Sequence, residues 1–257
     1  MPSLHLTSCR YLGLVIALTL TACVTTEPIQ ISDEGDFPVK RLTKEPSPTV
    51  LIAHGCGGWR GGHHVFWAED IRYEGYNALL LNSFEPRGFK EVCNRGELVH
   101  PSIRAKDIDN AARWVKAQKW HRGKVAVIGF SHGGSTALNI ANSSEIKNVD
   151  AVISFYPGCG VQGGRDFVGV SMRNPVLPAQ VHFGSKDDWT PPSRCISSGF
   201  KADKYETYFY PNAGHGFDEY RNTPIRAANG HWLSFDMEAT IQAKKRVFDF
   251  LSKNLKD

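Results

Sequence analysis

The sequence lacks the dense run of lysine and arginine, interleaved with aromatic residues, that marks many nucleic-acid-binding proteins. Its 257 residues include 30 Lys and Arg against 26 Asp and Glu, which gives a formal net charge of only +4. Binding to a phosphate backbone depends on concentrated positive charge. We therefore expect no nucleic-acid partner.

Signals for a metal or a cofactor are also missing. His63, His64 and His231 show no partner spacing typical of a metal site. The glycine-rich stretch His54-Gly55-Cys56-Gly57-Gly58 matches neither of two phosphate-binding patterns, G-x-G-x-x-G and G-x-x-x-x-G-K-[ST]. We therefore expect neither a metal site nor a phosphate-binding loop.

No internal repeat, low-complexity segment or second domain boundary divides the chain. Hydrophobic residues make up 41% of the sequence and charged residues 22%, which is ordinary for a globular protein. A chain of this length can bury a sizeable core without metals or many crosslinks. One large domain is therefore predicted.

Residues 1–23 have the order of a bacterial export signal. Arg10 precedes an apolar run over residues 11–20, which is too short to span a bilayer. The following Leu20-Thr21-Ala22-Cys23 resembles the lipobox, in which the cysteine is lipidated and becomes the mature N-terminus. We predict a lipoprotein signal peptide over residues 1–22, a lipid anchor on Cys23, a polar tether over residues 23–37 and a domain over residues 38–257. The alternative is ordinary cleavage near Ala22, which would leave a soluble exported protein.

The predicted anchor sets an expected location. A lipidated chain would be held at a membrane of the bacterial cell envelope and would face the periplasm or the exterior. Val24 follows the cysteine, in place of the aspartate that retains lipoproteins at the inner membrane of enteric bacteria. In a Gram-negative host we therefore expect the outer membrane.

Apolar, β-rich runs alternate with helical patterns along the rest of the chain. Strands are predicted over residues 49–53, 76–81, 124–128, 149–155, 178–183 and 206–210, and a short first strand over residues 29–31. Helices are predicted to open at Pro101, to follow the strand 124–128 and to close the chain around residues 241–255. This alternation predicts an α/β fold with a doubly wound, mostly parallel sheet and helices on both faces. The glycine-rich stretch over residues 157–175 is predicted to be a long active-site loop, and it is too short for a separate cap domain.

Gly129-Phe130-Ser131-His132-Gly133 lies between the predicted strand 124–128 and a helix. A serine hydroxyl is a poor nucleophile unless it is exposed beside a base, and a tight strand-to-helix turn with flanking glycines exposes it. The start of the helix also places free N–H groups and the helix dipole next to the serine. Ser131 is the predicted nucleophile.

An acid and a base follow in the chain order serine, aspartate, histidine that this kind of fold uses. Asp187 follows the strand 178–183, where a carboxylate can orient an imidazole, and the neighbouring Asp188 is the alternative. His215 lies between two glycines after the last strand and is the predicted general base. The oxyanion is expected to bind one N–H after the nucleophile and one from the loop after the strand 49–53. We assign these to the backbones of His132 and Cys56.

Several motifs together resemble the dienelactone hydrolase family. They are His54-Gly55-Cys56-Gly57-Gly58, Asn82-Ser83-Phe84-Glu85-Pro86-Arg87-Gly88, Gly129-Phe130-Ser131-His132-Gly133, Asp187-Asp188-Trp189-Thr190-Pro191 and His215-Gly216-Phe217-Asp218. The resemblance implies a single α/β-hydrolase domain, no cofactor and a nucleophile–Asp–His triad that falls on Ser131, Asp187 and His215. The enzymes that give the family its name have a cysteine nucleophile and a glutamate on the loop after the third strand. This chain has Ser131 instead and lacks that glutamate.

The cysteines indicate two crosslinks. Cys9 would leave with the signal and Cys23 would carry lipid, so four of the six cysteines remain. An even number in an exported chain predicts two disulfides, in three possible connectivities, and four unpaired core cysteines are the alternative. The pairs Cys56–Cys93 and Cys159–Cys195 are favoured because they are closest in sequence and because loops at the carboxyl ends of neighbouring strands lie side by side.

These residues predict a serine hydrolase that cleaves a small carboxylic ester or lactone through an acyl-enzyme. Arg87 and Arg104 are candidates either for contact with a substrate carboxylate or for a structural role. Two other functions stay open: a small peptidase of the prolyl-oligopeptidase type, and a catalytically silent envelope lipoprotein that uses the fold for binding.

Overall fold

The computed structural model describes residues 27–31, 36–60, 63–162, 165–166, 174–222, 224–227 and 229–256. The predicted signal peptide, Cys23 and the start of the predicted tether lie outside these residues.

A seven-stranded sheet with the order β1-β3-β2-β4-β5-β8-β9 forms the centre of the molecule. All neighbours in it are parallel except β1, which pairs with β3 in the antiparallel direction. The strands are β1 (Val39–Arg41), β2 (Ser47–Ala53), β3 (Asn77–Leu81), β4 (His121–Phe130), β5 (Ala151–Phe155), β8 (Ala179–Gly184) and β9 (Glu206–Tyr210). Two small antiparallel pairs lie outside the sheet: β6 (Val161–Gln162) with β7 (Arg165–Asp166), and β10 (Ile225–Arg226) with β11 (Trp232–Leu233).

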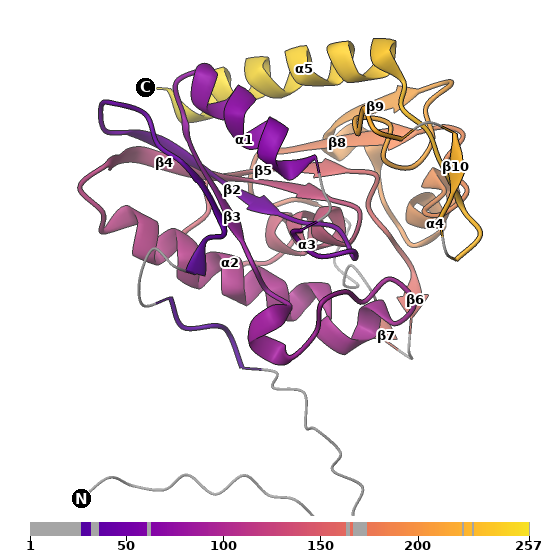
Figure 1. Ribbon diagram of the computed structural model, residues 1–257, viewed down its shortest axis with the longest axis horizontal. Coiled ribbons are helices and arrows are strands. Elements are labelled where there is room, and N and C mark those ends of the chain that lie inside the picture. The colour runs from indigo at the N-terminus through magenta and orange to yellow at the C-terminus, as the bar shows by residue number, and fades with distance from the viewer. Residues whose placement is uncertain are drawn as a thin grey trace, which may run out of the picture.

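Helices cover both faces of the sheet. One face packs against α1 and α5, and the other against α2 and α3, as Figure 1 shows with α1 and α5 above the sheet and α2 and α3 below it. The helices are α1 (His64–Tyr73), α2 (Pro101–Lys116), α3 (His132–Ala141), α4 (Pro192–Ser197) and α5 (Met237–Leu255), with 3-10 turns η2 (Glu85–Arg87), η3 (Gly96–Val99) and η4 (Ala202–Lys204). The predicted doubly wound α/β fold is therefore confirmed.

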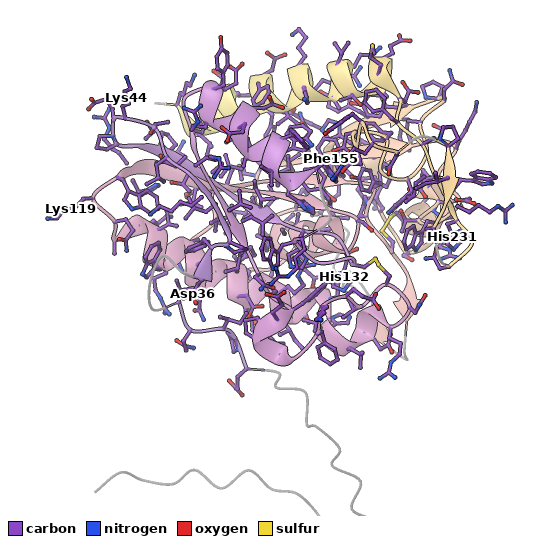
Figure 2. All side chains as sticks on the ribbon, viewed as in Figure 1. Asp36, Lys44, Lys119, His132, Phe155 and His231 are labelled. Carbon is purple, nitrogen blue, oxygen red and sulfur yellow. A yellow bond between two sulfur atoms is a disulfide. The ribbon has the colours of Figure 1, made fainter. Side chains whose placement is uncertain are left out.

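The two cores follow from the alternation of side chains along each strand. In β2, Val50 and Ile52 join the core under α1 and α5, while Leu51 and Ala53 join the core under α2 and α3. Both sets are buried, and residues 50–53 therefore form one continuous apolar run. Figure 2 shows side chains filling both spaces between the sheet and its helices.

The order of the strands in the sheet determines where a binding site is expected. From β2 the chain first adds β3 on one side, and it later returns to add β4 on the other side. In an open α/β sheet, ligands bind beyond the carboxyl ends of the strands at such a reversal point. The loops after β2 and β4, which contain Cys56 and Ser131, meet there.

The predicted first strand over residues 29–31 is wrong, because this segment is irregular and is bound to α2 instead. The Ile29 N–H donates to Asp107 Oδ1 at 2.8 Å, and Asn110 Nδ2 donates to the Ile29 carbonyl at 3.2 Å. Arg87 Nη2 donates to the Glu27 carbonyl at 2.7 Å, and Ile31 packs against the core. The first strand of the sheet is β1, and the folded unit already includes residues 27–31. No helix among the described residues is long and apolar enough to cross a membrane.

Candidate active site

Ser131 stands on a strained turn between β4 and α3. Its backbone has φ 54° and ψ −113°, a left-handed conformation that is unfavourable for a residue with a side chain. A Cβ on Gly129 would lie 2.0 Å from the Gly133 carbonyl oxygen, and one on Gly133 would lie 2.0 Å from the Ala53 carbonyl oxygen. The flanking glycines are therefore required, because the turn is pressed against itself and against β2. This packing lifts the Ser131 hydroxyl out at the carboxyl end of the sheet.

The structure brings Ser131, His215 and Asp187 into one hydrogen-bonded chain. His215 Nε2 lies 3.0 Å from Ser131 Oγ, and His215 Nδ1 lies 2.8 Å from Asp187 Oδ2. Because a carboxylate can only accept, the bond to Asp187 places a proton on Nδ1 and leaves Nε2 to accept the serine proton. His215 and Asp187 are both 4% exposed, so water competes little for either bond.

Asp187 is fixed by its own loop. Its Oδ1 accepts the backbone N–H groups of Trp189 and Thr190, each at 2.8 Å. Burial alone would raise the pKa of Asp187, but His215 and the donors from Thr190 lower it below its ordinary value. The carboxylate is therefore charged at neutral pH. Asp188, the alternative acid, points elsewhere and accepts the Trp232 N–H at 3.1 Å.

Sequence reasoning missed Thr190 and Tyr156. The Thr190 hydroxyl lies 2.9 Å from Asp187 Oδ2, 3.1 Å from His215 Nδ1 and 3.0 Å from the Tyr156 carbonyl. The Tyr156 ring packs 4.7 Å from the His215 ring, on a backbone with φ 35°. Thr190 lies three residues after Asp187, and a threonine at this spacing is the sequence signal that could have identified it as a partner of the carboxylate.

A buried ion pair holds the loop that carries His215. Asp218 accepts from Trp67 Nε1 and from the Tyr156 hydroxyl, each at 2.7 Å, and His63 Nε2 lies 3.2 Å from it. Burial alone would lower the pKa of His63, but Asp218 and Glu219 raise it to about 9. The pair is therefore charged at neutral pH. No spacing in the sequence predicts it, since its members come from distant segments.

The loop after β2 approaches Ser131 closely. A Cβ on Gly55 would lie 3.7 Å from Ser131 Cβ. Cys56 follows it, and the disulfide Cys56–Cys93 joins this loop to the segment after β3. The Val92 N–H also donates to the Cys56 carbonyl at 2.8 Å. Cys56 and His132, the two residues predicted to bind the oxyanion, thus both lie close to Ser131. Cys56 is on the loop after β2, and His132 is the first residue of α3, which follows β4.

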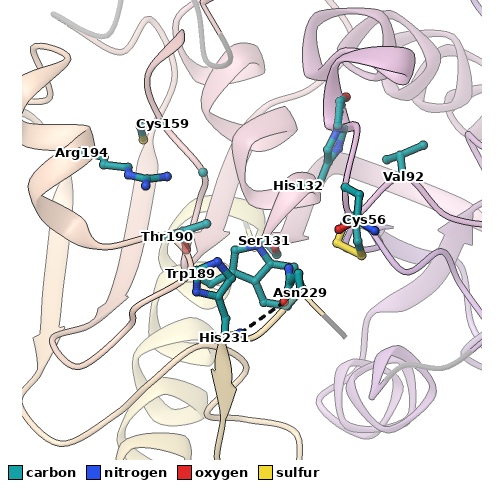
Figure 3. A pocket seen from close by; sticks show the side chains of 14 residues that line it. Cys56, Val92, Ser131, His132, Cys159, Trp189, Thr190, Arg194, Asn229 and His231 are labelled. Atoms are coloured by element: carbon teal, nitrogen blue, oxygen red, sulfur yellow. Dashed lines mark hydrogen bonds between the residues drawn. A yellow bond between two sulfur atoms is a disulfide. The ribbon is translucent and has the colours of Figure 1, made fainter. Parts of the chain in front are cut away.

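Ser131 lines two cavities. The first, of about 250 Å³, is lined mainly by polar groups that include Asn94, Arg194, Asn229 and His231. Figure 3 shows Ser131 between Thr190 on one side and His132 and Cys56 on the other. The second, of about 290 Å³, is lined largely by apolar surface. It contains Phe130, Tyr156, His215, Ala227 and Leu233. Cys56, Cys93 and Trp189 line both cavities.

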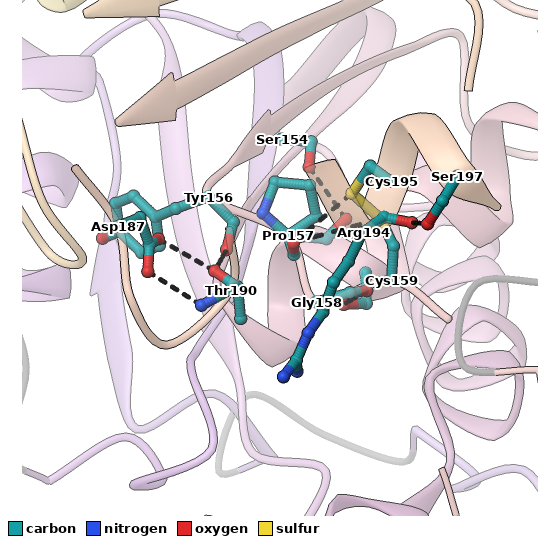
Figure 4. Close-up of a disulfide and its surroundings, with 12 residues drawn as sticks. Ser154, Tyr156, Pro157, Gly158, Cys159, Asp187, Thr190, Arg194, Cys195 and Ser197 are labelled. Carbon is teal, nitrogen blue, oxygen red and sulfur yellow. Dashed lines mark hydrogen bonds between the residues drawn. A yellow bond between two sulfur atoms is a disulfide. The ribbon is translucent and has the colours of Figure 1, made fainter. Parts of the chain in front are cut away.

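A second disulfide, Cys159–Cys195, closes the opposite rim of the first cavity. It joins the loop after β5 to α4, just beyond the Asp187 loop, as Figure 4 shows. Both disulfides have the pairing favoured from the sequence, and each connects loops that follow neighbouring strands of the sheet.

Arg87 does not contact the site, so its proposed contact with substrate is corrected. Its guanidinium bonds both oxygens of Asp107 at 2.9 Å, and the two side chains are 1% and 0% exposed. It therefore ties residues 27–31 and the loop after β3 to α2. Arg104 is also buried, and it bonds the His54 carbonyl and the His132 ring. Among the described residues no group of three or more acidic, histidine or cysteine side chains is arranged to hold a metal.

Comparison with known proteins places the chain in one family. A model described as the dienelactone hydrolase family matches residues 39–255. The chain is 30% identical over 226 residues to a carboxymethylenebutenolidase of Pseudomonas putida, covering 81% of this chain and 87% of that protein. It is also 30% identical over 154 residues to carboxymethylenebutenolidase 1 of Cupriavidus pinatubonensis, covering 59% and 57%.

Solved structures agree in fold. A dienelactone hydrolase from Anabaena variabilis superimposes with a TM-score of 0.60 at 18% identity, covering 84% of this chain and 91% of that one. Est1E from Butyrivibrio proteoclasticus, solved with ferulic acid bound, superimposes with a TM-score of 0.58 at 15% identity, covering 84% and 94%.

Proposed function

The chain belongs to the dienelactone hydrolase family and is a hydrolase of ester or lactone bonds, and from this we propose that it acts through a covalent acyl-enzyme on Ser131. The observation that carries the proposal is the hydrogen-bonded chain from Ser131 through His215 to Asp187. A histidine whose Nδ1–H is held by a buried carboxylate has its Nε2 free to act as a base toward the hydroxyl.

Acylation proceeds by attack of Ser131 Oγ on the carbonyl carbon. The serine proton passes to His215 Nε2 as the new C–O bond forms, and Asp187 stabilises the imidazolium. The carbonyl oxygen becomes an oxyanion that accepts from the N–H groups of Cys56 and His132. When the tetrahedral intermediate collapses, the bond to the leaving oxygen breaks and that oxygen takes the proton from His215.

Deacylation repeats these steps with water. His215 removes a proton from a water molecule whose oxygen adds to the acyl carbon. When the second tetrahedral intermediate collapses, the bond from the acyl carbon to Ser131 Oγ breaks, Oγ takes the proton back from His215, and the carboxylic acid leaves. In a lactone the leaving alcohol stays attached to the acyl group, so only the ring opens.

The two cavities support an orientation for the substrate. The general acid must reach the leaving oxygen, and His215 lines the apolar cavity, whereas His132 lines the polar one. We therefore assign the alcohol part to the surface that includes Phe130, Tyr156 and Leu233. The acyl part extends into the polar cavity, toward Arg194.

Covalent labelling tests the nucleophile. A fluorophosphonate probe should label the purified protein, and Ser131→Ala should lose both labelling and hydrolysis of p-nitrophenyl acetate while keeping its thermal unfolding transition. The exposed Ser193 on α4 provides the matched control, since Ser193→Ala should label like the parent. Equal labelling of the Ser131 variant would refute the proposed nucleophile, and a protein that neither labels nor hydrolyses esters would favour the silent lipoprotein.

We also propose that the chain is exported and held at the cell envelope by lipid on Cys23. The support is the order of residues 1–23 and the lipobox-like Leu20-Thr21-Ala22-Cys23. Cys23→Ser should move the protein from the membrane pellet to the soluble exported fraction, while Cys9→Ser should not. A mass for the mature protein that shows no acyl group on Cys23 would rule out the anchor.

A further inference from the structure

A buried arginine behind the predicted oxyanion hole takes no direct part in the proposed acylation and deacylation of Ser131. Arg104 on α2 is 1% exposed. Its Nη2 donates to the His54 carbonyl at 2.9 Å, and its Nη1 donates to His132 Nδ1 at 2.8 Å. It thereby joins the loop after β2 to the first residue of α3, the two segments that carry the predicted oxyanion donors.

The positive charge of Arg104 is not neutralised by a direct partner. No carboxylate of the described chain lies within salt-bridge distance of it, whereas the other buried arginine, Arg87, bonds Asp107 at 2.9 Å. Within the same described part, Arg104 Nε is buried without a hydrogen-bond partner, and the guanidinium lies 4.8 Å from the centre of the Phe84 ring. The charge of Asp107 favours the charged form of Arg104 without forming an ion pair with it. Burying a charge that has no direct ionic partner is costly, so a fold that retains one in contact with His132, the residue after Ser131, is a candidate for using it in function.

The histidines that contact Arg104 are neutral. Because a guanidinium only donates, His132 Nδ1 must accept, and its Nε2 then carries the proton that it donates to the Gly96 carbonyl at 3.0 Å. Burial and the charge of Arg104 lower the pKa of His132 to about 3. Burial likewise lowers the pKa of His54, with Arg104 adding to the shift. Burial lowers the pKa of Arg104 to about 9, with the charge of Asp107 opposing the shift, so Arg104 is still the charged member of the cluster at neutral pH.

His54 connects this charge to one of the donors. Its Nδ1 donates to the Gly55 carbonyl at 2.8 Å. That carbonyl and the Cys56 N–H belong to the same peptide group, so a bond to the oxygen polarises the N–H and fixes its direction. Arg104 holds the His54 carbonyl in turn, and on its other side it holds the ring of His132, whose backbone N–H is the second predicted donor.

We propose that Arg104 is a positioning residue of the oxyanion hole, which fixes the spacing of the Cys56 and His132 segments and stabilises the oxyanion with its buried charge. The inference rests on the proposed function of Ser131. A substrate ester is neutral, whereas its tetrahedral intermediate carries a negative charge, and a cation in a medium of low polarity acts over several ångströms. The charge therefore favours the transition state over the bound substrate, and its loss should lower kcat more than it raises KM.

Neutral and charged replacements separate the role of the charge from that of packing. Arg104→Met should lower kcat for p-nitrophenyl acetate by about 10²-fold with KM changed less than about threefold, and should weaken a trifluoromethyl ketone inhibitor in parallel. Arg104→Lys keeps the charge and should retain clearly more kcat than the Met variant. Arg87→Met is the matched control, because it also removes a buried arginine from this side of the sheet; it should cost stability but leave kcat per fluorophosphonate-titrated site unchanged.

Chemical rescue decides between charge and hydrogen bonding. Millimolar guanidinium should restore part of the kcat of Arg104→Ala, and urea, its neutral analogue of the same shape, should not. Equal rescue by urea, equal kcat in the Lys and Met variants, or equal loss per titrated site in the Arg87 variant would overturn the proposal. Should Arg104→Ala not fold, the Lys and Met comparison alone decides. A parent protein that does not label at Ser131 would instead refute the proposed function.

Discussion

The orientation of His215 depends on a small group of residues around one carboxylate. Asp187 receives the His215 Nδ1–H, two backbone N–H groups and a contact from the Thr190 hydroxyl. With both oxygens occupied, the carboxylate has little freedom to rotate. The imidazole therefore keeps the tautomer in which Nε2 faces Ser131, and Trp189 packs 4.8 Å from it on the side of the substrate cavities.

Replacement of the acid is the first prediction at this scale. Asp187→Asn should lower kcat for p-nitrophenyl acetate by about 10²–10⁴-fold, because an amide favours the wrong histidine tautomer and cannot stabilise the imidazolium. Asp188→Asn should have much less effect, since that side chain is 44% exposed and bonds the Trp232 N–H. Steady-state kinetics of both variants make the comparison. A larger loss for Asp188→Asn would show that the acid is one residue further along.

Single residues divide into those that the sequence could reveal and those that it could not. Ser131, Asp187 and His215 are recognisable because each directly follows a strand and their order fits the fold. Arg87 and Arg104 were not separable from the sequence, because only the packing of α2 shows that one has Asp107 as a partner and the other has neutral histidines. The His63–Asp218 pair depends on contacts across 155 positions of the chain, as 218 − 63 gives, and no local pattern encodes it.

At the scale of elements, the strands were predictable because their signal is local. Residues 50–53 of β2, for example, are all apolar, since both faces of the strand are covered there. The segment at residues 27–31 was mistaken for a strand for the same reason: it has apolar residues at alternate positions, but its backbone groups bond side chains of α2 and no neighbouring strand. Local pattern cannot distinguish these two uses of an extended chain.

The disulfides give the prediction at this scale. Each closes a loop of similar length, with sequence separations of 37 and 36, for which the chain-entropy estimate is about 3–4 kcal/mol of stability. Replacing both Cys56 and Cys93 by Ala should lower the free energy of unfolding by about this amount. It should also lower kcat, because the loop beside Ser131 is no longer crosslinked to the segment after β3. The backbone N–H at position 56 is still present in this variant, so the expected loss comes from its position and not from its absence.

The pair Cys159 and Cys195 serves as the comparison. Its double Ala variant should lose similar stability but less activity, because this bridge lies on the rim of the polar cavity, beyond the Asp187 loop. Urea unfolding and kinetics on p-nitrophenyl acetate measure both effects. Unchanged stability in both double variants, or four free thiols in the exported protein, would contradict the prediction.

For the whole molecule, buried histidines set how stability responds to acid. Burial lowers the pKa values of four of them, which are His54, His64, His132 and His182. In the unfolded chain a histidine has its ordinary pKa of about 6.5. Below that pH the unfolded state binds protons that the folded state does not bind. Each of these four histidines can therefore lower the free energy of unfolding by up to about 1.4 kcal/mol per pH unit.

His63 responds to pH in the opposite sense. Burial alone would lower its pKa, but the charges of Asp218 and Glu219 raise it to about 9. The folded state thus keeps a proton that the unfolded state loses above about pH 6.5. The stability from this group is complete below pH 6.5 and is lost as the pH rises toward 9. Since Asp218 belongs to the segment that carries His215, the same change should loosen the support of the His215 loop.

The free energy of unfolding should therefore pass through a maximum near pH 6.5. Urea titrations between pH 5 and pH 9 should show a steep decline on the acid side, where several histidines act together, and a shallower decline of on the order of 2–3 kcal/mol on the alkaline side. His63→Gln should flatten the alkaline side and leave the acid side steep, because it removes the one histidine whose folded pKa is raised to about 9. His231→Gln is the control, since that ring is 35% exposed at the rim of the polar cavity, and it should change neither side. A stability that rises on acidification below pH 6.5, or an alkaline decline that persists in the His63 variant, would show that these buried histidines do not govern the response.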